Sequence, residues 1–222
     1  MSWDATWDEI FDAREWGRYP PEELIRFVAR TFGSVADRGA VRILEIGCGP
    51  GANLWYLARE GFSAYGIDGS ELAVALARRR LAGERLDAET IVGDFTNLTE
   101  HFPAAAFDAV VDLAGLQHNA MAHVERALEE TRAVLKPGGH VFSMLLAAGS
   151  WGDGLGREVE PGTFSDVTEG PAAGTGVCHF FTLEEVERVF RRFEDVAVEY
   201  SERSLGNRTR VYRHWVVTGR RP

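Results

Sequence analysis

The chain has 222 residues, and its 24 lysine and arginine residues against 34 aspartate and glutamate residues give a formal charge of −10. Hydrophobic residues make up 45% and charged residues 26%, as in ordinary globular domains, which excludes intrinsic disorder for most of the chain. The acidic balance disfavours nucleic acid as a partner, and the longest uncharged apolar run, residues 141–148, is far too short to span a bilayer.

The N-terminus and the cysteines bear on the cellular compartment. No basic segment followed by an apolar run opens the sequence, so we expect no signal peptide. Cys48 and Cys178 stand far apart without metal-type neighbours, so we expect neither a disulfide scaffold nor a metal site. These features predict a cytoplasmic protein without a membrane partner, and they leave the oligomeric state open.

Residues 1–38 predict an N-terminal helical segment ahead of a main domain at residues 39–222. An apolar face at helical spacing, with acidic residues between its members, indicates the first helix; it consists of Trp3, Trp7, Ile10 and Phe11. A second amphipathic helix is expected from about Pro21 to about Ala36. The tryptophans of this segment, Trp16 included, could pack the helices or line a substrate site.

From residue 39 onward, apolar strands and amphipathic helices alternate. Strands are predicted at residues 41–46, 62–67, 89–92, 107–113 and 140–146. This alternation predicts an α/β fold with a doubly wound, mostly parallel sheet. After a helix near residues 182–190, two strands at 196–200 and 210–218 flank the turn Gly206-Asn207, which predicts an antiparallel hairpin at the end of the sheet.

Residues 149–178 form an expected insertion that is rich in glycine and lacks periodicity. Long segments of this kind inside a compact domain are usually functional or disordered. Residues 149–178 could be a flexible, solvated surface loop. Its aromatic residues, Trp151 and Phe164, favour a packed segment instead.

A glycine-rich loop, Gly47-Cys48-Gly49-Pro50-Gly51, joins the first predicted strand to its helix. Alternating glycines allow a tight turn and a close approach of a ligand to the backbone. With Ala52 at the sixth position, the loop also fits the permissive dinucleotide fingerprint G-x-G-x-x-G/A, so the loop alone does not identify its ligand.

Acidic residues stand at the ends of four predicted strands: Glu45, Asp68, Asp94 and Asp112. The carboxyl ends of parallel strands are where open α/β sheets bind ligands. A carboxylate at Asp68 can accept hydrogen bonds from both hydroxyls of a ribose. The pair Asp94-Phe95 could accept from the exocyclic amine of an adenine and cover one face of its ring.

Five segments in this order resemble the motifs of class I S-adenosylmethionine-dependent methyltransferases. They are Leu44-Glu45-Ile46-Gly47-Cys48-Gly49-Pro50-Gly51, Gly66-Ile67-Asp68, Gly93-Asp94-Phe95, Phe107-Asp108-Ala109-Val110-Val111-Asp112 and Leu135-Lys136-Pro137-Gly138-Gly139. The resemblance covers residues 40–146. It implies a Rossmann-like seven-stranded sheet, an N-terminal helical lid, and S-adenosylmethionine as the donor with S-adenosylhomocysteine as the product.

The resemblance also implies which residues bind the cofactor. The loop glycines Gly47, Gly49 and Gly51 would pass under the methionine moiety and ribose, Glu45 would fix the loop, and Asp68 would take the ribose hydroxyls. The remaining cofactor-binding candidates are Tyr19, Cys48, Gly69, Asp94, Phe95, Asp112 and Leu113. The segment Asp112-Leu113-Ala114-Gly115 lacks the Asn/Asp-Pro-Pro-aromatic run of nucleic acid and protein amide methylation, which favours a small-molecule acceptor with an oxygen or nitrogen nucleophile.

Two histidines are candidates for accepting a proton from the acceptor, because an imidazole titrates near neutral pH. His118 follows the fourth predicted strand, and His179 precedes the helix near residue 182. Each could equally serve a local structural role. A dedicated base is optional, since alignment of nucleophile, methyl group and sulfur supplies much of the acceleration in methyl transfer.

Three other functions use the same glycine loop. A nicotinamide-dependent oxidoreductase would leave the acidic residue Glu45 and the Asp94-Phe95 pair without a role. A non-catalytic S-adenosylmethionine-binding module would keep the whole cofactor site. The same fold could also direct S-adenosylmethionine to a different reaction, such as a rearrangement.

Overall fold

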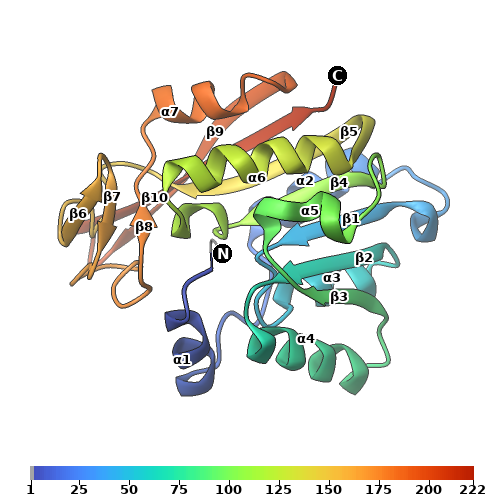
Figure 1. Ribbon diagram of the computed structural model, residues 1–222, viewed down its shortest axis with the longest axis horizontal. Helices are drawn as coiled ribbons and strands as arrows, with labels where there is room; N and C mark the ends of the chain where they lie inside the picture. The colour runs from blue at the N-terminus through green and yellow to red at the C-terminus, as the bar shows by residue number, and fades with distance from the viewer. Residues whose placement is uncertain (1–2) are drawn as a thin grey trace.

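The computed structural model describes residues 3–222, and its main feature is a seven-stranded sheet in the order β3-β2-β1-β4-β5-β10-β9 (Figure 1). The strands are β1 (Arg42–Ile46), β2 (Ser63–Asp68), β3 (Ala88–Val92), β4 (Phe107–Leu113), β5 (Leu135–Leu146), β9 (Glu194–Leu205) and β10 (Arg210–Arg220). The first five pair in parallel, whereas β10 runs antiparallel to both β5 and β9. The predicted doubly wound sheet with an antiparallel terminal hairpin is confirmed.

Helices cover both faces of this sheet. They are α1 (Thr6–Ala13), α2 (Glu22–Phe32), α3 (Ala52–Arg59), α4 (Glu71–Gly83), α5 (Leu98–His101), α6 (Met121–Val134) and α7 (Leu183–Phe190), with 3-10 turns η1 (Arg38–Ala40), η2 (Phe95–Asn97) and η3 (Leu116–His118). On one face α2 and α3 bury Phe27 and Leu54. On the other face, which is toward the viewer in Figure 1, α6 and α7 bury Val124 and Phe190. Within residues 3–222, no helix is long and apolar enough to cross a membrane.

Several predicted boundaries were wrong. The first helix begins at Thr6, so Trp3 lies before it, and β5 begins at Leu135 rather than at residue 140, because Leu135 already pairs with Phe107 of β4. The second helix ends at Phe32 rather than near Ala36, because Gly33 closes its last turn through a hydrogen bond from its N–H to the Ala29 carbonyl. The terminal hairpin is longer than predicted, since backbone pairing continues through polar residues. Glu202 of β9 pairs with Arg213 of β10, and their side chains form an ion pair at the exposed edge.

The insertion is ordered by a second, three-stranded sheet. Its strands are β6 (Arg157–Glu160), β7 (Thr163–Ser165) and β8 (Cys178–His179), all antiparallel. Val167, Cys178 and Phe180 pack with Leu146 in a small apolar core. The interpretation as a solvated surface loop is therefore wrong. Strands of two to four residues are too short to show a hydrophobic period in the sequence of this segment.

Candidate functional site

The glycine-rich loop turns sharply at the carboxyl end of β1. The N–H groups of Gly47 and Cys48 both donate to the Ile67 carbonyl, at 2.9 and 3.1 Å, and this binds the loop to the end of β2. Gly51 has φ +80°, and a Cβ there would lie 2.8 Å from the Ala77 Cβ. Glycine is therefore required at position 51 both for the left-handed backbone and for the close packing of the loop on α4.

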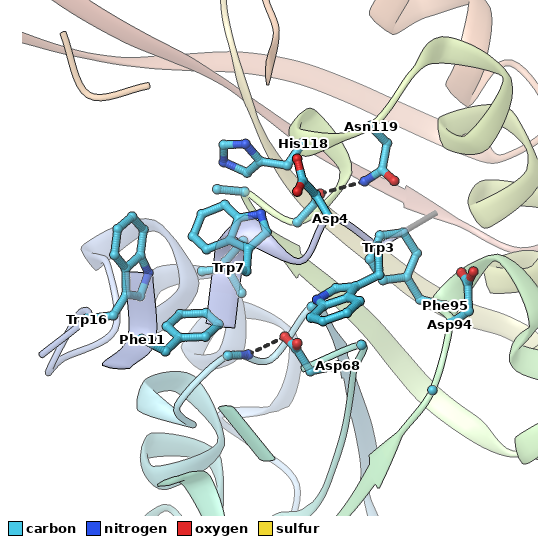
Figure 2. A pocket seen from close by; sticks show the side chains of 17 residues that line it. Trp3, Asp4, Trp7, Phe11, Trp16, Asp68, Asp94, Phe95, His118 and Asn119 are labelled. Carbon is cyan, nitrogen blue, oxygen red and sulfur yellow. Dashed lines mark hydrogen bonds between the residues drawn. The ribbon is translucent and has the colours of Figure 1, made fainter. Parts of the chain in front are cut away.

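Asp68 connects the end of β2 to the glycine loop. Its Oδ2 accepts a hydrogen bond from the Gly49 N–H at 2.8 Å, and its Oδ1 accepts from the Ser70 N–H at 2.9 Å. Burial raises the pKa of Asp68, and the two backbone donors oppose this rise. Asp68 also lines a cavity, so the structure places its carboxylate both under the loop and against a ligand-sized space (Figure 2).

Glu45 and Asp112 lie beneath the loop rather than in the cavity wall. Glu45 is 1% exposed and accepts a hydrogen bond from Asn53 Nδ2 at 2.6 Å. Burial raises the pKa of Glu45 well above its usual range. Asp112 accepts hydrogen bonds from the Gly115 N–H at 2.8 Å and from the Ser143 hydroxyl, and burial raises its pKa to about 6. Cys48 is also buried, and with Gly51 it lies outside the cavity wall.

The cavity contains about 690 Å³ of space not filled by atoms, part of it open to solvent. Of the candidate cofactor-binding residues, the cavity wall brings together Gly47, Gly49, Asp68, Gly69, Asp94, Phe95 and Leu113. Asp94 Oδ1 accepts hydrogen bonds from the N–H and hydroxyl of Thr96, at 2.9 and 2.7 Å. The ends of β1, β2, β3 and β4 thus converge on one space.

Helix α1 covers the cavity with aromatic side chains. Trp7 and Phe11 project from it, with ring centroids 5.5 Å apart, and Trp16 packs edge-on against Trp7 at 5.2 Å. Asp8 of α1 accepts a hydrogen bond from the Ser70 hydroxyl at the start of α4. The N-terminal segment is therefore held across the cavity by both packing and a polar contact.

Trp3 occupies the part of the cavity nearest β2 and β3. Figure 2 shows its indole between Asp68 and Phe95. The indole packs directly on Gly69, where any Cβ would collide with it. Its Nε1–H is buried and has no hydrogen-bond partner among residues 3–222.

His118 lines the cavity at the end of η3, and its surroundings fix its protonation. Its Nδ1 lies 3.0 Å from the carbonyl oxygen of Val177, which can only accept, so Nδ1 carries the hydrogen. Burial lowers the pKa of His118 to about 4, so the ring is neutral at pH 7 and Nε2 is an acceptor. The Trp7 ring packs edge-on against the imidazole at 4.7 Å.

His179 and Tyr19 lie away from this cavity. His179 is fully buried in β8, with Nδ1 at 2.6 Å from the Thr163 hydroxyl and Nε2 at 3.4 Å from Glu185 Oε2. Its contacts join the insertion to the start of α7. Tyr19 is 69% exposed and packs against Trp55.

Two cavity residues did not emerge from the sequence analysis. Asp4 precedes α1, where its Oδ1 accepts a hydrogen bond from the Thr6 N–H at 2.9 Å. Asn119 directly follows His118, and its Nδ2 donates to the Gly115 carbonyl at 3.0 Å. The available signals were an acid at a helix start and a polar residue beside His118, and both patterns are common outside functional sites.

Comparisons with known proteins agree with this site. Residues 43–139 match a family model described as a methyltransferase domain. The chain is 36% identical over 128 residues to the S-adenosyl-L-methionine-dependent Diels-Alderase iccD of Talaromyces variabilis, over 56% of this chain and 43% of that protein. It is 35% identical over 111 residues to the demethylmenaquinone methyltransferase of Clavibacter sepedonicus, over 50% of this chain and 43% of that protein. In both cases the match spans less than half the length of the relative.

The crystal structure of a SAM-dependent methyltransferase from Methanosarcina mazei is similar with a TM-score of 0.67 and 26% identity, over 81% of this chain and 92% of that chain. The similarity therefore extends beyond the matched domain to most of the fold. Together with the strand order, these findings show that residues 43–139 match a methyltransferase domain and that the chain has the fold of class I S-adenosylmethionine-dependent methyltransferases.

Proposed function

We propose that the chain transfers a methyl group from S-adenosylmethionine to a small-molecule acceptor. The observation that supports this most directly is the convergence of the glycine loop, Asp68, Asp94 and Phe95 on one cavity. Sulfonium methyl donors react by in-line displacement, so the protein must mainly align the partners and exclude water. The aromatic side chains of α1 that cover the cavity would exclude water from it.

The residues present fit the cofactor. Asp68 offers carboxylate oxygens to ribose hydroxyls, the cradle at Gly47 and Gly49 admits close backbone approach, and Phe95 offers an aromatic face. When bound, S-adenosylmethionine supplies an activated methyl group on a positively charged sulfur. Glu45 and Asp112 support the site from below by holding Asn53 and the Gly115 N–H in place.

We propose that the N-terminal segment is a lid and that His118 positions the acceptor. A neutral imidazole with a free Nε2 can accept a hydrogen bond from an O–H or N–H group. Its lowered pKa makes it a weak base, so alignment rather than proton removal is its main contribution. His179 has no place in this proposal, because its buried contacts lie outside the cavity. Both cysteines are free and buried, which favours a reducing, cytoplasmic location.

The His118→Gln variant tests that role. Because its low pKa keeps His118 unprotonated as the pH falls from 7 to 5, kcat/KM of the original protein should show no inflection near pH 6.5. His118→Gln keeps an acceptor oxygen and should lose less than about tenfold in kcat/KM, whereas His118→Leu should lose at least about tenfold. An inflection near pH 6.5 that disappears in His118→Gln would instead establish proton transfer to this histidine.

The Trp3→Ala variant tests whether the indole must leave before the cofactor enters. Trp3 packs on Gly69 in the space that the adenosine would need, so its removal should tighten S-adenosylhomocysteine binding about tenfold. Calorimetry gives the affinity, and Trp151→Ala, which removes an indole outside the cavity, should leave it unchanged. Weaker binding in Trp3→Ala would mean that the indole stacks on the ligand.

The proposed function is tested first by calorimetric titration with S-adenosylhomocysteine and, separately, with NAD. Binding of the former and not the latter establishes the donor site, and the reverse result eliminates the proposal. Release of S-adenosylhomocysteine from S-adenosylmethionine with an acceptor then distinguishes methyl transfer from non-catalytic binding. The same measurement separates methyl transfer from a reaction that keeps the methyl group, which matters because one relative is named as a Diels-Alderase.

A further inference from the structure

One end of the cavity, here called the acceptor subsite, consists of Asp4, Trp7, His118 and Asn119. Figure 2 shows Asp4 near His118 and Asn119, on the side of the cavity away from Asp68. None of these four residues has a counterpart in the cofactor motifs at the strand ends. The subsite is therefore the place for the acceptor if the proposed function holds.

The hydrogen-bonding groups of the subsite have fixed directions. Asn119 is 5% exposed, and its Nδ2 donates a hydrogen bond to the Gly115 carbonyl. Turning the amide over would place Oδ1 against that carbonyl oxygen, so the orientation of the amide is fixed. Its Oδ1 is then an acceptor, and this atom is buried without a partner among residues 3–222. Buried polar atoms rarely stay unpaired, so Oδ1 is available to accept a hydrogen bond from a ligand in the cavity.

His118 offers a second acceptor. Its Nδ1–H is engaged by the Val177 carbonyl, and Gln117 places a donor Nε2 at 3.4 Å from His118 Nε2 while Gln117 Oε1 accepts from the Leu146 N–H at 2.9 Å. Because Nδ1 carries the hydrogen and Gln117 turns its NH₂ group toward the ring, His118 Nε2 is the unprotonated nitrogen. Its contact with Gln117 is long, which leaves Nε2 able to accept a stronger hydrogen bond.

Asp4 gives the subsite a negative charge. One carboxylate oxygen is held by the Thr6 N–H, and the other lies against Gly176 of the insertion, where a Cβ would collide with it. Between Trp3 and Asn119, the residues described as lining the cavity include no lysine or arginine. The guanidinium of Arg14 lies over Trp16, 4.9 Å from the ring centroid, and is not part of the cavity wall.

We propose that the acceptor is an amine carried on a flat apolar body, and that carboxylate or phosphate compounds of the same shape are rejected. Asp4 would take the ammonium form, Asn119 Oδ1 and His118 Nε2 would accept its N–H groups, and Trp7 with Phe11 would cover the apolar body. An anion would be repelled by the Asp4 carboxylate and would find no lysine or arginine among the described residues of the cavity wall.

The reaction balances for the neutral amine without a protein base. The nitrogen lone pair forms the new N–C bond as the C–S bond breaks, and sulfur keeps the bonding pair, leaving a methylammonium product and a neutral thioether. An amine bound as ammonium first loses one proton to solvent. This agrees with the weak basicity of His118.

The test uses matched pairs of ligands on the full chain saturated with S-adenosylhomocysteine. Tryptamine and indole-3-acetate share one body, as do phenethylamine and 3-phenylpropionate. Calorimetry should show the amines binding at least about tenfold more tightly than the acids. Equal or tighter binding of the acids, or no binding of either, would overturn the inference.

Variants assign the selectivity to the subsite. Asp4→Asn keeps an oxygen for the Thr6 N–H and should lower amine affinity about tenfold, while Asp12→Asn, an exposed change on the helix α1 that follows Asp4, should not. Asn119→Leu, which removes the acceptor oxygen, should bind amines more weakly than the original protein. Unchanged amine selectivity in both Asp4→Asn and Asn119→Leu would contradict the assignment.

The inference about the amine acceptor rests on the proposed function, and different experimental results would contradict each of them. Loss of the proposed function appears as no binding of S-adenosylhomocysteine in the first titration, before any acceptor is added. Failure of the inference alone appears as normal S-adenosylhomocysteine binding without preference for amines.

Discussion

Replacing Asp68 with alanine is expected to lower the affinity for S-adenosylhomocysteine at least about 100-fold. The carboxylate faces the cavity, and the same two oxygens hold the N–H groups of Gly49 and Ser70. Alanine would remove the acceptor for the ligand's hydroxyls and also leave both backbone donors unpaired, which loosens the loop. Calorimetry of the purified variant measures the affinity, and thermal unfolding reports whether the fold survives.

Two further variants make this result interpretable. Asp68→Asn keeps one acceptor oxygen and should fall between the original protein and Asp68→Ala. Asp87→Ala removes an exposed carboxylate just before β3, at the opposite end of the sheet, and should leave binding unchanged. If Asp68→Ala binds S-adenosylhomocysteine as the original protein does, the cavity at the ends of β1 to β4 is not the donor site.

Replacing Phe107 with alanine is expected to destabilise the fold by about 3–5 kcal/mol. Phe107 is fully buried at the start of β4, and its ring packs edge-on against Tyr65 and Phe102 at centroid distances of 5.2 and 5.1 Å. The Arg42 guanidinium lies over the same ring at 5.3 Å. The variant would therefore lose aromatic packing, a cation–π contact and the filling of a dense core.

Urea unfolding followed by circular dichroism measures this loss. Val159→Ala in β6 shortens a side chain that is 46% exposed, so its free energy of unfolding should stay within about 0.5 kcal/mol of the original value. At low denaturant, Phe107→Ala should still bind S-adenosylhomocysteine, because Phe107 lies at the amino end of β4 and the cavity at the carboxyl ends. A loss below about 1 kcal/mol would mean that the core closes around the missing ring.

The strands of the sheet could be predicted from the sequence because each strand and the turn after it are marked by residues that are neighbours in the chain. The strand from Arg42 to Ile46 is a short apolar run, and a glycine-rich turn follows it, so the change from strand to helix is visible in a few residues. The same pattern predicts where the acidic residues at the strand ends lie, since parallel strands place their carboxyl ends on one edge of the sheet. Asp68 and Asp94 could thus be assigned to one region before any contact was known.

Sequence patterns could not separate residues that line the cavity from residues that support it. Glu45 and Asp68 look alike in sequence, yet Glu45 lies under the loop and Asp68 faces the cavity. His118 and His179 are likewise both candidate proton acceptors when only the sequence is considered. Only the packing of the insertion places the Val177 carbonyl on His118 and encloses His179 between Thr163 and Glu185.

The sequence by itself therefore determined the topology of the main sheet, the resemblance to class I methyltransferases and the edge of the sheet at which we propose cofactor binding, because strand periodicity and turn residues act over short distances. The tertiary structure decided what covers that edge. Trp3 and Asp4 meet Gly69 and Gly176 across large separations in the chain, and such contacts depend on how helix α1 and the insertion pack together. No local pattern encodes that packing, since it is the sum of many long-range contacts.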